Sequence, residues 1–373
     1  MYNKRMISIA FTGGGTGGHI YPGLAVAAEL RKQLPCSDYK LFWIGSSSGI
    51  DRSLVEGANI EFFGVPSGKL RRYFSLRTII DFFKVIAGFF AARKILKKQN
   101  AKILFSKGGF VSVPPCAAAA SLGLTIFTHE SDYSPGLATK INARFVSGSG
   151  GIFTAYEDTA KFFSSKARDY ITVTGNPVRS VFFNADPSKG RAFLKTSNEA
   201  RILLVLGGSQ GAAEINELVR AALDDLTKIY TVVHQTGPNQ KWDIPESEKY
   251  KPFPYINEEM PHVMAAAELV MGRSGAGIWE WAVLGKPMLL IPLRGAGTRG
   301  DQVENAHYFE NAKAAKVLLT PSAGELVSEV KSFADDENKR KEAANASKKL
   351  GGINSADFIA KILAEEISDI LDN

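Results

Sequence analysis

The sequence predicts an α/β protein built from two doubly wound, parallel-sheet domains that face each other across a cleft. The main observation is a glycine-rich turn that occurs twice, at 13–18 and at 207–211. Each turn directly follows a short apolar run, at 7–11 and at 202–206, and precedes a predicted helix. Glycine lets the backbone approach a ligand closely, and the free N–H groups at the start of a helix favour phosphate. A length of 373 residues also fits two domains.

The first half alternates predicted strands with predicted helices, which is the pattern of a parallel sheet covered by helices on both faces. Short apolar runs that end at a glycine or a polar turn indicate the strands Ile7–Thr12, Lys40–Gly45, Ile60–Val65, Ile103–Ser106, Thr125–His129, Gly151–Thr154 and Ile171–Thr174. The segments between them indicate the helices Pro22–Leu34, with proline in its first turn, a basic helix within 68–98, Pro114–Leu122 and Pro135–Phe145.

The second half repeats this alternation after a break at Gly175-Asn176-Pro177, and 183–199 is expected to be a linker with one short helix. The predicted strands are Ile202–Leu206, Tyr230–His234, Leu269–Met271 and Pro287–Pro292. The predicted helices are Ala212–Leu226, Met260–Ala266, Ile278–Leu284, Asp301–Asn311 and the whole stretch from Gly324. Parallel sheets of this kind bind ligands at the carboxyl ends of their strands, where the glycine turns lie.

The composition excludes several classes of protein. With 45% hydrophobic and 22% charged residues, the chain has the composition of a soluble globular protein. Its two cysteines, Cys36 and Cys116, are far apart, so we expect reduced thiols in a cytosolic protein. We find no signal peptide before the first strand and no metal-ligand spacing. The sequence therefore predicts neither export nor a metal cofactor.

The net charge of +7 is concentrated in one segment. Residues 68–98 hold nine basic residues and one acidic residue, a net charge of +8, so the rest of the chain sums to −1. Apolar residues of this segment recur at helical spacing, at Leu76, Ile79, Ile80, Phe83, Ile86, Ala87 and Phe90, with Lys69 and Arg72 just before them. Such a helix suits an anionic membrane surface, or it packs on the core with its basic face in water. No nucleic-acid-binding motif accompanies the charge, so we expect no nucleic-acid partner.

Two common nucleotide-binding interpretations fit these turns poorly. Neither turn contains the Gly-Lys-Ser/Thr of a P-loop. Gly13, Gly15 and Gly18 have the spacing of a dinucleotide-binding turn, but nothing else in the chain indicates hydride chemistry.

Polar side chains beside the turns are candidates for catalysis and binding. His19 ends the first turn at the start of a helix, and histidine is the most frequent general base. Glu130 and Asp132 follow a strand of the same half, where they could orient a substrate hydroxyl or His19. In the second half, Glu280 lies one turn past a third glycine turn, in a place that suits ribose hydroxyls.

Three further residues have positions that suit a sugar nucleotide. Gln302 and Asn305 follow a strand end, and their spacing of three places them on one helix face. Arg179 lies at the domain junction, where a cation can reach a phosphate from either side.

Taken together, the motifs resemble those of one family, the N-acetylglucosaminyltransferases of peptidoglycan synthesis. They occur in the family's order over residues 8 to about 310 and are specific as a set. They are Thr12-Gly13-Gly14-Gly15-Thr16-Gly17-Gly18-His19, Lys107-Gly108-Gly109-Phe110-Val111-Ser112, His129-Glu130-Ser131-Asp132, Gly175-Asn176-Pro177-Val178-Arg179, Gly207-Gly208-Ser209-Gln210-Gly211, Arg273-Ser274-Gly275-Ala276 and Asp301-Gln302-Val303-Glu304-Asn305-Ala306.

The resemblance implies a GT-B fold of two Rossmann-like domains. Residues 1–178 with the C-terminal helix at about 355–373 would bind the acceptor and the membrane, and residues 179–354 would bind the UDP-sugar donor. The implied reaction transfers N-acetylglucosamine from UDP-N-acetylglucosamine to the 4-hydroxyl of the muramyl sugar of undecaprenyl-pyrophosphoryl-N-acetylmuramyl-pentapeptide, with inversion. The implied location is peripheral, at the cytoplasmic face of the cell membrane, with cell-wall synthesis proteins as partners and roles in cell shape and division.

The resemblance also implies roles for individual residues. The loop of Gly17, Gly18 and His19 would bind the lipid acceptor. The residues that would contact UDP-N-acetylglucosamine are Thr16, Gly17, Gly18, Asp132, Arg179, Ser209, Gln210, Ser274, Gly275, Ala276, Glu280, Gln302 and Asn305. The basic apolar helix falls where the family has its membrane-association patch, which gives Leu76, Ile79, Ile80, Phe83, Lys69 and Arg72 as membrane contacts.

Several alternatives remain open at the level of the sequence. His19 is the first candidate for the base and Glu130 the second. Helix N–H groups after 207–211 would stabilise the leaving diphosphate, so the predicted reaction needs no metal ion. A UDP-N-acetylglucosamine epimerase or another glycolipid synthase would share the fold, and a non-catalytic, sugar-nucleotide-binding peripheral membrane protein would share the turns.

Overall fold

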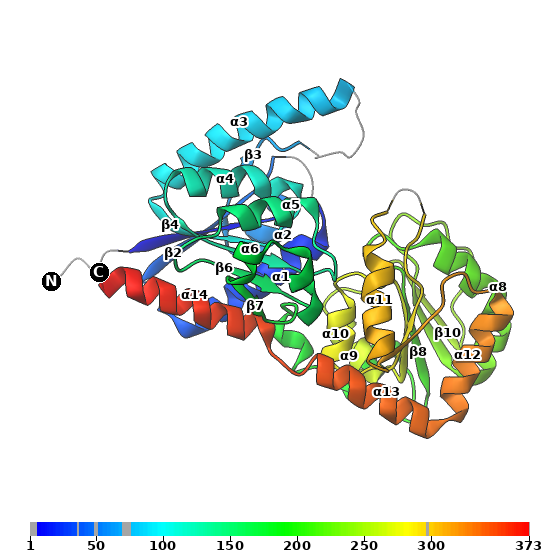
Figure 1. Cartoon of the computed structure of the whole chain (residues 1–373). Coiled ribbons are helices and arrows are strands. Elements are labelled where there is room, and N and C mark those ends of the chain that lie inside the picture. Colours follow the sequence, from blue (N-terminus) through cyan, green and yellow to red (C-terminus); the bar gives the residue numbers. More distant parts are fainter. Residues whose placement is uncertain (1–5, 36, 48–50, 69–75, 296–297, 373) are drawn as a thin grey trace. The chain divides into compact units, whose positions relative to one another are not determined.

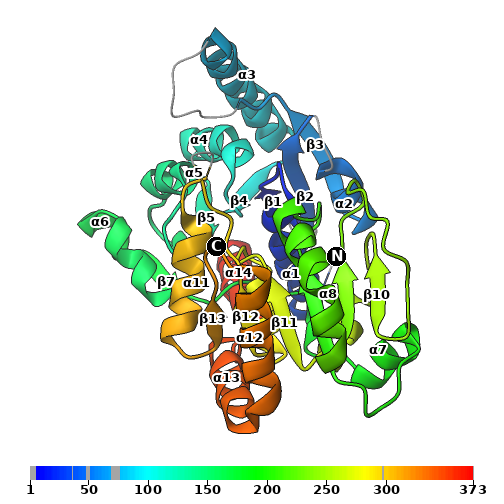
Figure 2. The same ribbon diagram turned by 90° about the vertical axis from the view of Figure 1, so that its right-hand side faces the viewer.

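The computed structural model describes residues 6–35, 37–47, 51–68, 76–295 and 298–372, with the side chains of 76–79 excepted. The chain divides into two compact units, Met1–Arg179 with Ile353–Asn373 (unit 1) and Ser180–Gly352 (unit 2). Each unit is a parallel sheet covered by helices (Figure 1, Figure 2). This confirms the predicted α/β class with two parallel sheets.

The sheet of unit 1 has seven parallel strands in the order β3-β2-β1-β4-β5-β6-β7. Its strands are β1 (Ile7–Thr12), β2 (Tyr39–Ser46), β3 (Glu61–Val65), β4 (Ala101–Ser106), β5 (Thr125–Glu130), β6 (Gly151–Thr154) and β7 (Ile171–Val173). The strand order reverses between β1 and β4, so the loops after these two strands begin side by side.

The helices of unit 1 cover both faces of this sheet. They are α1 (Gly17–Gln33), α2 (Asp51–Gly57), α3 (Leu76–Lys98), α4 (Val113–Ser121), α5 (Leu137–Asn142), α6 (Ser165–Arg168) and α14 (Ser355–Asp372), with short 3₁₀ turns at η1 (Phe110–Ser112), η2 (Ala143–Phe145) and η3 (Glu157–Phe162). The C-terminal helix α14 therefore belongs to the same unit as the first strand, and it packs against α1.

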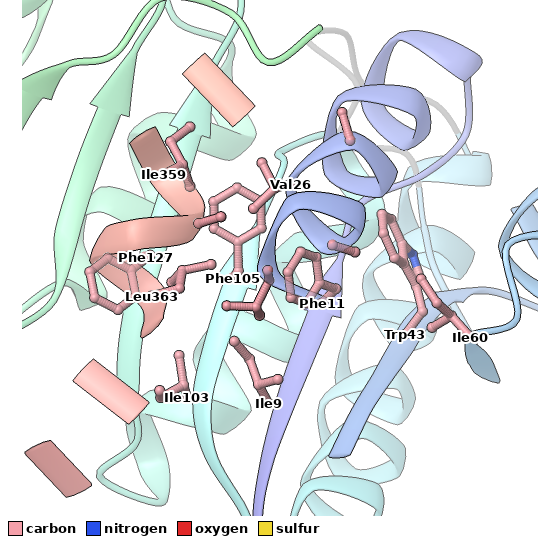
Figure 3. Close-up of a cluster of buried hydrophobic side chains, with 14 of the residues drawn as sticks. Ile9, Phe11, Val26, Trp43, Ile60, Ile103, Phe105, Phe127, Ile359 and Leu363 are labelled. Atoms are coloured by element: carbon pink, nitrogen blue, oxygen red, sulfur yellow. The ribbon is translucent and has the colours of Figure 1, made fainter. Parts of the chain in front are cut away.

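Alternate residues of each strand enter opposite cores, as the period of two requires. In β1, Ile9 and Phe11 point into the core beneath α1 and α14, whereas Ala10 points into the core beneath α3 and α4. Figure 3 shows the first of these cores, in which Ile359 and Leu363 of α14 lie among the aromatic rings of the strands. This packing holds the loops at the carboxyl ends of the strands in fixed positions.

The sheet of unit 2 has six parallel strands in the order β10-β9-β8-β11-β12-β13. Its strands are β8 (Ile202–Leu206), β9 (Thr231–Gln235), β10 (Tyr250–Phe253), β11 (Leu269–Gly272), β12 (Met288–Leu290) and β13 (Ala315–Val317). Its helical elements are η4 (Ser180–Phe182), α7 (Pro187–Leu194), α8 (Ala213–Ile229), α9 (Met260–Ala266), α10 (Ile278–Val283), α11 (Asp301–Asn311), α12 (Ala323–Asp335) and α13 (Glu337–Leu350). Here the strand order reverses between β8 and β11.

Several elements differ from the sequence prediction. The strands β10 and β13 were not predicted, because Pro252 lies in β10 and both are short strands at the two edges of their sheet. The expected linker contains α7, which packs on α9 within unit 2. Gly190 permits this contact, since a Cβ there would lie 2.1 Å from the carbonyl oxygen of His262.

Helix boundaries differ at both ends of the chain. Helix α1 begins five residues before Pro22, because a turn closed by the His19 N–H and the Thr16 carbonyl starts it earlier. Proline removes only one hydrogen bond of such a long helix. The C-terminal stretch forms three helices, not one, with breaks at Asp336 and at 351–354. Asp336 caps the second of them by accepting a hydrogen bond from the Lys339 N–H.

Candidate active site

In each unit, two glycine turns follow the pair of strands between which the strand order reverses. In unit 1 these turns are 13–18 after β1 and 107–109 after β4. In unit 2 they are 207–211 after β8 and 273–277 after β11. Open parallel sheets bind ligands at this point of the carboxyl edge, because the loops diverge there and leave room. Each unit therefore has its own candidate ligand site.

The first glycine turn of unit 1 is held by two side chains of neighbouring elements. The indole Nε1 of Trp43 donates to the Gly13 carbonyl at 3.0 Å. The carboxylate of Asp51, only 1% exposed, accepts from the N–H groups of Gly15 at 3.0 Å and Ser46 at 3.1 Å. A Cβ on Gly14 would lie 2.0 Å from this carboxylate. Sequence reasoning missed Asp51, because its partner in the turn is 36 positions away.

The ring of His19 packs against the second glycine turn of unit 1. A Cβ on Gly109 would lie 3.0 Å from Cδ2 of His19 and 2.9 Å from the Gly14 carbonyl oxygen. Gly109 also has φ of 77°, a conformation that favours glycine. His19 remains partly exposed, as does Gly17, and Thr16 and Gly18 are exposed. The two turns thus support His19 at the carboxyl edge and leave it accessible.

Glu130, the second candidate for the base, has its carboxylate engaged by the backbone. One oxygen accepts from the N–H groups of Ser131 and Asp132, at 2.9 and 3.0 Å, and the other accepts from the N–H of Gly136 at 3.0 Å. The residue is buried. A carboxylate that closes the turn after β5 in this way is suited to hold the loop. Asp132, the next acidic residue, is partly exposed at the same edge.

A buried lysine connects three loops beneath this edge. Lys107 is 1% exposed, and its Nζ donates to Ser131 Oγ, which in turn donates to Asn176 Oδ1, both at 2.5 Å. Burial lowers the pKa of Lys107 to about 8, and the charges of Glu130 and Asp132 partly oppose this shift. This chain of hydrogen bonds ties together the ends of β4 and β5 and the segment after β7. In the sequence Lys107 stands within a motif, and no property of the sequence predicts a role for it.

His129 is buried in the neutral form. Its Nε2 lies 2.9 Å from the Gly175 carbonyl, which only accepts, so this nitrogen carries the proton. Its Nδ1 is buried and has no hydrogen-bond partner within the described residues. Desolvation, together with the nearby charge of Lys107, lowers the pKa of His129 well below the ordinary value for histidine.

This histidine should make the folded protein less stable in mild acid. Below about pH 6.5 the unfolded chain takes up a proton at His129 that the folded chain excludes. The free energy of unfolding therefore decreases as the pH is lowered. One such proton amounts to about 2 kcal/mol between pH 6.5 and pH 5. We expect urea unfolding of His129→Gln, which keeps a donor for Gly175, to show a weaker pH dependence by about this amount.

The control for this prediction is a histidine on the surface. His307→Gln removes a ring whose side chain is 46% exposed, and it shows what the loss of a surface histidine does in the same measurement. Equal slopes for His129→Gln and the wild-type protein would contradict the assignment of the neutral form to His129.

Arg179 belongs to unit 1 and lies beside its first glycine turn. Its guanidinium carbon is 5.1 Å from the centre of the Tyr21 ring, a cation–π contact. A Cβ on Gly17 would lie 3.2 Å from the same ring. Tyr21 thus connects Arg179 to the turn that carries His19. The structure places this cation, predicted at the donor site, next to the turn of unit 1.

In unit 2, the turn after β8 presents exposed groups at the start of a long helix. Gly208, Ser209 and Gln210 are exposed, and α8 begins at Ala213. Glu214 in the first helical turn would repel an anion, but its carboxylate pairs with Arg273 at 2.7 Å. Arg273 is also fixed by donating to the Ile291 carbonyl at 2.9 Å. The free N–H groups and dipole at this helix start suit a phosphate.

The second glycine turn of unit 2, at 273–277 after β11, is joined to α11 by buried hydrogen bonds. Ser274, fully buried, donates from Oγ to the Gln302 carbonyl at 2.6 Å. Asn305, also fully buried, donates from Nδ2 to the Ser274 carbonyl at 3.1 Å. These two predicted contact residues therefore hold the loop together. Gly275, Ala276, Glu280 and Gln302 are partly exposed, and the Oε1 of Gln302 accepts from the Leu293 N–H at 2.9 Å.

Helix α3 packs on the rest of unit 1 through one side of its C-terminal half. Gly88, Ala92 and Leu96, four positions apart, form the buried side, and a Cβ on Gly88 would lie 2.2 Å from the Pro66 carbonyl oxygen. Four other large apolar side chains face outward, with exposed fractions of 56% for Ile80, 61% for Phe82, 63% for Phe83 and 64% for Phe90. Phe89 and Ile95 are partly buried against the same core. Figure 1 shows α3 as the outermost helix on its side of unit 1.

Four predicted membrane contacts lie outside this description. Lys69 and Arg72 fall outside the described residues, as do the side chains of Leu76 and Ile79. Within the described part of the chain, no helix combines the length and apolarity that crossing a bilayer requires. Among the same residues, no group of three or more histidine, cysteine or carboxylate side chains could hold a metal ion.

Comparisons with known proteins agree with this architecture. Residues 9–149 match the N-terminal domain of glycosyltransferase family 28, and residues 202–361 match its C-terminal domain. The UDP-N-acetylglucosamine--N-acetylmuramyl-(pentapeptide) pyrophosphoryl-undecaprenol N-acetylglucosamine transferase of Treponema denticola is 46% identical over 335 residues, 84% of each chain. The protein of the same name from Treponema pallidum (strain Nichols) is 43% identical and covers 97% of this chain and 96% of its own.

Solved structures show the same fold. MurG of Acinetobacter baumannii has a TM-score of 0.72 at 22% identity, covering 96% of this chain and 99% of its own. The UDP-GlcNAc 2-epimerase of Neisseria meningitidis, bound to UDP-GlcNAc, has a TM-score of 0.66 at 12% identity, covering 96% and 100%. The two parallel α/β units have the GT-B fold, which this epimerase shares, and the two family matches define the protein as a glycosyltransferase. The chain belongs to glycosyltransferase family 28, which confirms the resemblance found in the sequence.

Proposed function

We propose that this protein transfers N-acetylglucosamine from UDP-N-acetylglucosamine to the 4-hydroxyl of the muramyl sugar of undecaprenyl-pyrophosphoryl-N-acetylmuramyl-pentapeptide, the step from lipid I to lipid II in peptidoglycan synthesis. The observation that carries this proposal is the 46% identity to a transferase of that name over 84% of both chains. Relatives of the same name match at 36–43% identity over nearly the full length of this chain.

The acceptor side of the reaction is assigned to unit 1. The acceptor hydroxyl attacks the anomeric carbon from the face opposite UDP, so the configuration inverts and the hydroxyl loses a proton. His19 is the group we assign to take this proton, because it is partly exposed and is supported by both glycine turns. The backbone bonds of Glu130 favour a role in shaping the loop over a role as the base.

The donor side is assigned to unit 2. The leaving diphosphate gains negative charge as the glycosidic bond breaks, and the N–H groups at the start of α8 suit that charge. Ser209 and Gln210 would meet the diphosphate, Glu280 the ribose and Gln302 the sugar hydroxyls. Each of these side chains is exposed or partly exposed at the carboxyl edge of the sheet.

The transfer itself is the first experiment. Radiolabelled UDP-N-acetylglucosamine is incubated with a short-chain lipid-linked muramyl-pentapeptide, with and without a chelator. We expect label in the lipid product in both reactions, because the proposed stabilisation of the diphosphate comes from helix N–H groups. Absence of transfer with UDP-sugar binding intact would contradict the proposed acceptor and favour an epimerase or another glycolipid acceptor. If the chelator stops the transfer, the proposal that the diphosphate leaves without the help of a metal ion is wrong.

We further propose that the protein works at the cytoplasmic surface of the membrane, where α3 lies on an anionic bilayer. Five large apolar side chains of α3 are exposed, namely Ile80, Phe82, Phe83, Ile86 and Phe90. The exposed lysines of α3 (Lys84, Lys94, Lys97 and Lys98) would meet lipid phosphates. Packing within the unit does not explain why these phenylalanines are exposed, and an exposed apolar patch of this kind marks an interaction surface. The lipid-linked acceptor would then be reached at the surface in which it is anchored.

Removing the aromatic contact should release the protein from vesicles. We expect Phe82→Ser combined with Phe83→Ser to weaken binding to vesicles containing phosphatidylglycerol by about 100-fold or more, since each buried phenylalanine contributes about 1.5 to 3 kcal/mol. Turnover of a water-soluble short-chain acceptor should be retained. Phe358→Ser, on α14 of the same unit, removes an exposed phenylalanine elsewhere and serves as the control. Unchanged vesicle binding by the double variant would refute the role of α3.

A further inference from the structure

One buried polar cluster in unit 2 has no part in the reaction described above. His234 of β9, Asn216 of α8 and Tyr250 of β10 are 0%, 3% and 2% exposed. Polar groups are costly to bury unless they are hydrogen-bonded, and an apolar trio would fill the same space at lower cost. His234, near the carboxyl end of β9, contacts Asn216 of α8 through one ring nitrogen and Tyr250 of β10 through the other. Figure 2 shows α8 and β10, the two elements that contribute these partners. Because the cluster adjoins the segment behind the turn at 207–211, we ask what it contributes besides filling the core.

The hydrogen bonds of the cluster fix the protonation of His234. Asn216 donates from Nδ2 to the Thr236 carbonyl at 3.0 Å, so its Oδ1 faces the ring. That oxygen lies 3.1 Å from Nε2 of His234, which must therefore carry the proton. The other ring nitrogen, Nδ1, then accepts from the Tyr250 hydroxyl at 3.0 Å. Burial lowers the pKa of His234 to about 4, so this neutral tautomer persists in neutral solution.

The segment that follows His234 lies directly behind the turn at 207–211. A Cβ on Gly211 would lie 2.1 Å from the Thr236 carbonyl oxygen, and a Cβ on Gly237 would lie 2.5 Å from the Gln210 carbonyl oxygen. Gln235 reaches the Gly208 carbonyl from Nε2 at 3.4 Å and accepts from a backbone N–H with its Oε1 at 3.0 Å. The two segments are thus in backbone contact along their length.

We infer that His234 is a positioning residue for the diphosphate of the sugar nucleotide, acting through Asn216 and Thr236 on the turn at 207–211 and the first turn of α8. The inference rests on the proposed function, since it takes that turn as the diphosphate site. Asn216 is the link, because it belongs to the first turn of α8 and is held by His234 from one side and by the Thr236 carbonyl from the other. Backbone N–H groups stabilise a bound anion well when the protein already holds them in the orientation that the anion requires.

A pair of substitutions separates positioning from filling of space. His234→Gln can place its amide nitrogen where Nε2 lies and can still donate to Asn216. His234→Asn places its amide nitrogen near Nδ1 and cannot. We expect His234→Asn and Asn216→Ala to weaken UDP binding by about tenfold or more, and His234→Gln by about threefold or less. The KM for the donor should rise in the same order, with the KM for the acceptor unchanged.

The matched control lies at the other end of the same strand. Tyr230, just before β9, donates from its hydroxyl to Glu268 at 2.8 Å, and Tyr230→Phe removes this bond at the amino edge, away from the turn. It should lower the unfolding temperature and leave UDP affinity unchanged.

The measurement is calorimetric titration of the full-length variants with UDP, below their unfolding temperatures. Wild-type affinity in His234→Asn and Asn216→Ala would overturn the inference and leave the proposed function standing. No UDP binding by the wild-type protein would overturn both. If His234→Asn does not fold, Asn216→Ala alone decides the question.

Discussion

Replacing His19 by alanine is expected to reduce the rate of transfer by about 10²- to 10⁴-fold, the range for loss of a general base. The affinity for UDP should remain that of the wild-type protein, because the donor turns belong to the other unit. The loss should appear in kcat, since the imidazole acts on the proton of the attacking hydroxyl. The measurement is steady-state transfer to a short-chain acceptor, with UDP binding followed separately by calorimetry.

Two further measurements make the assignment of the base specific. Added imidazole should restore part of the activity of His19→Ala, because a free base can enter the space left by the ring. His307→Ala, which removes an exposed histidine of α11, should retain full activity. Near-normal turnover in His19→Ala would instead move the role to Glu130. In that case Glu130→Gln should lose the activity, at a site where three backbone N–H groups now bind the carboxylate.

Replacing Gly109 by alanine is expected to reduce transfer by about 100-fold or more, although Gly109 has no side chain to react. The added Cβ would lie 2.9 Å from the Gly14 carbonyl oxygen and 3.0 Å from the His19 ring. The first of these neighbours is backbone and cannot rotate away, so the two glycine turns must separate. A displacement of about 1 Å in catalytic geometry is enough for a loss of this size.

Gly123 provides a matched control for backbone strain. Its φ is 70°, close to the 77° of Gly109, and a Cβ there would meet nothing within 4 Å. Gly123→Ala should therefore show only the strain of a left-handed alanine, about 1 to 2 kcal/mol in the free energy of unfolding, with transfer retained. Equal activities of Gly109→Ala and Gly123→Ala would show that the contact between the turns and His19 does not matter for catalysis.

Most of the sheet architecture could be predicted from the sequence because strands and glycine turns are local signals. A buried strand such as Ile202–Leu206 is a continuous apolar run, and the turn after it consists of neighbouring residues. The edge strands β10 and β13 were missed because short strands with Pro252 or Lys316 carry no such run. The short helix expected in the linker is present as α7, but its packing on α9 was not predicted, because that contact depends on Gly190 and on a helix about 70 residues further along.

The candidate site was predicted less completely than the fold. His19 was predicted because it adjoins a glycine turn, and its catalytic role stays a prediction for a side chain that the structure leaves partly exposed. For Asn305 and Ser274, predicted as substrate contacts, the structure adds what the sequence did not indicate: both are fully buried and bond to backbone carbonyls. Asp51 and His234 were missed, because their partners lie 36 and 18 positions away in the sequence.

The sequence by itself determined the α/β class, the paired glycine turns and the family, because these depend on runs of adjacent residues and on the order of motifs. It also determined that α3 is both basic and apolar. Only the tertiary structure decided that Gly88, Ala92 and Leu96 of this helix face the core and that Phe82, Phe83 and Phe90 face outward. It also decided that Glu130 is bound by backbone N–H groups while His19 is accessible. The reason is physical, since exposure and hydrogen bonding depend on atoms that the folded chain brings together.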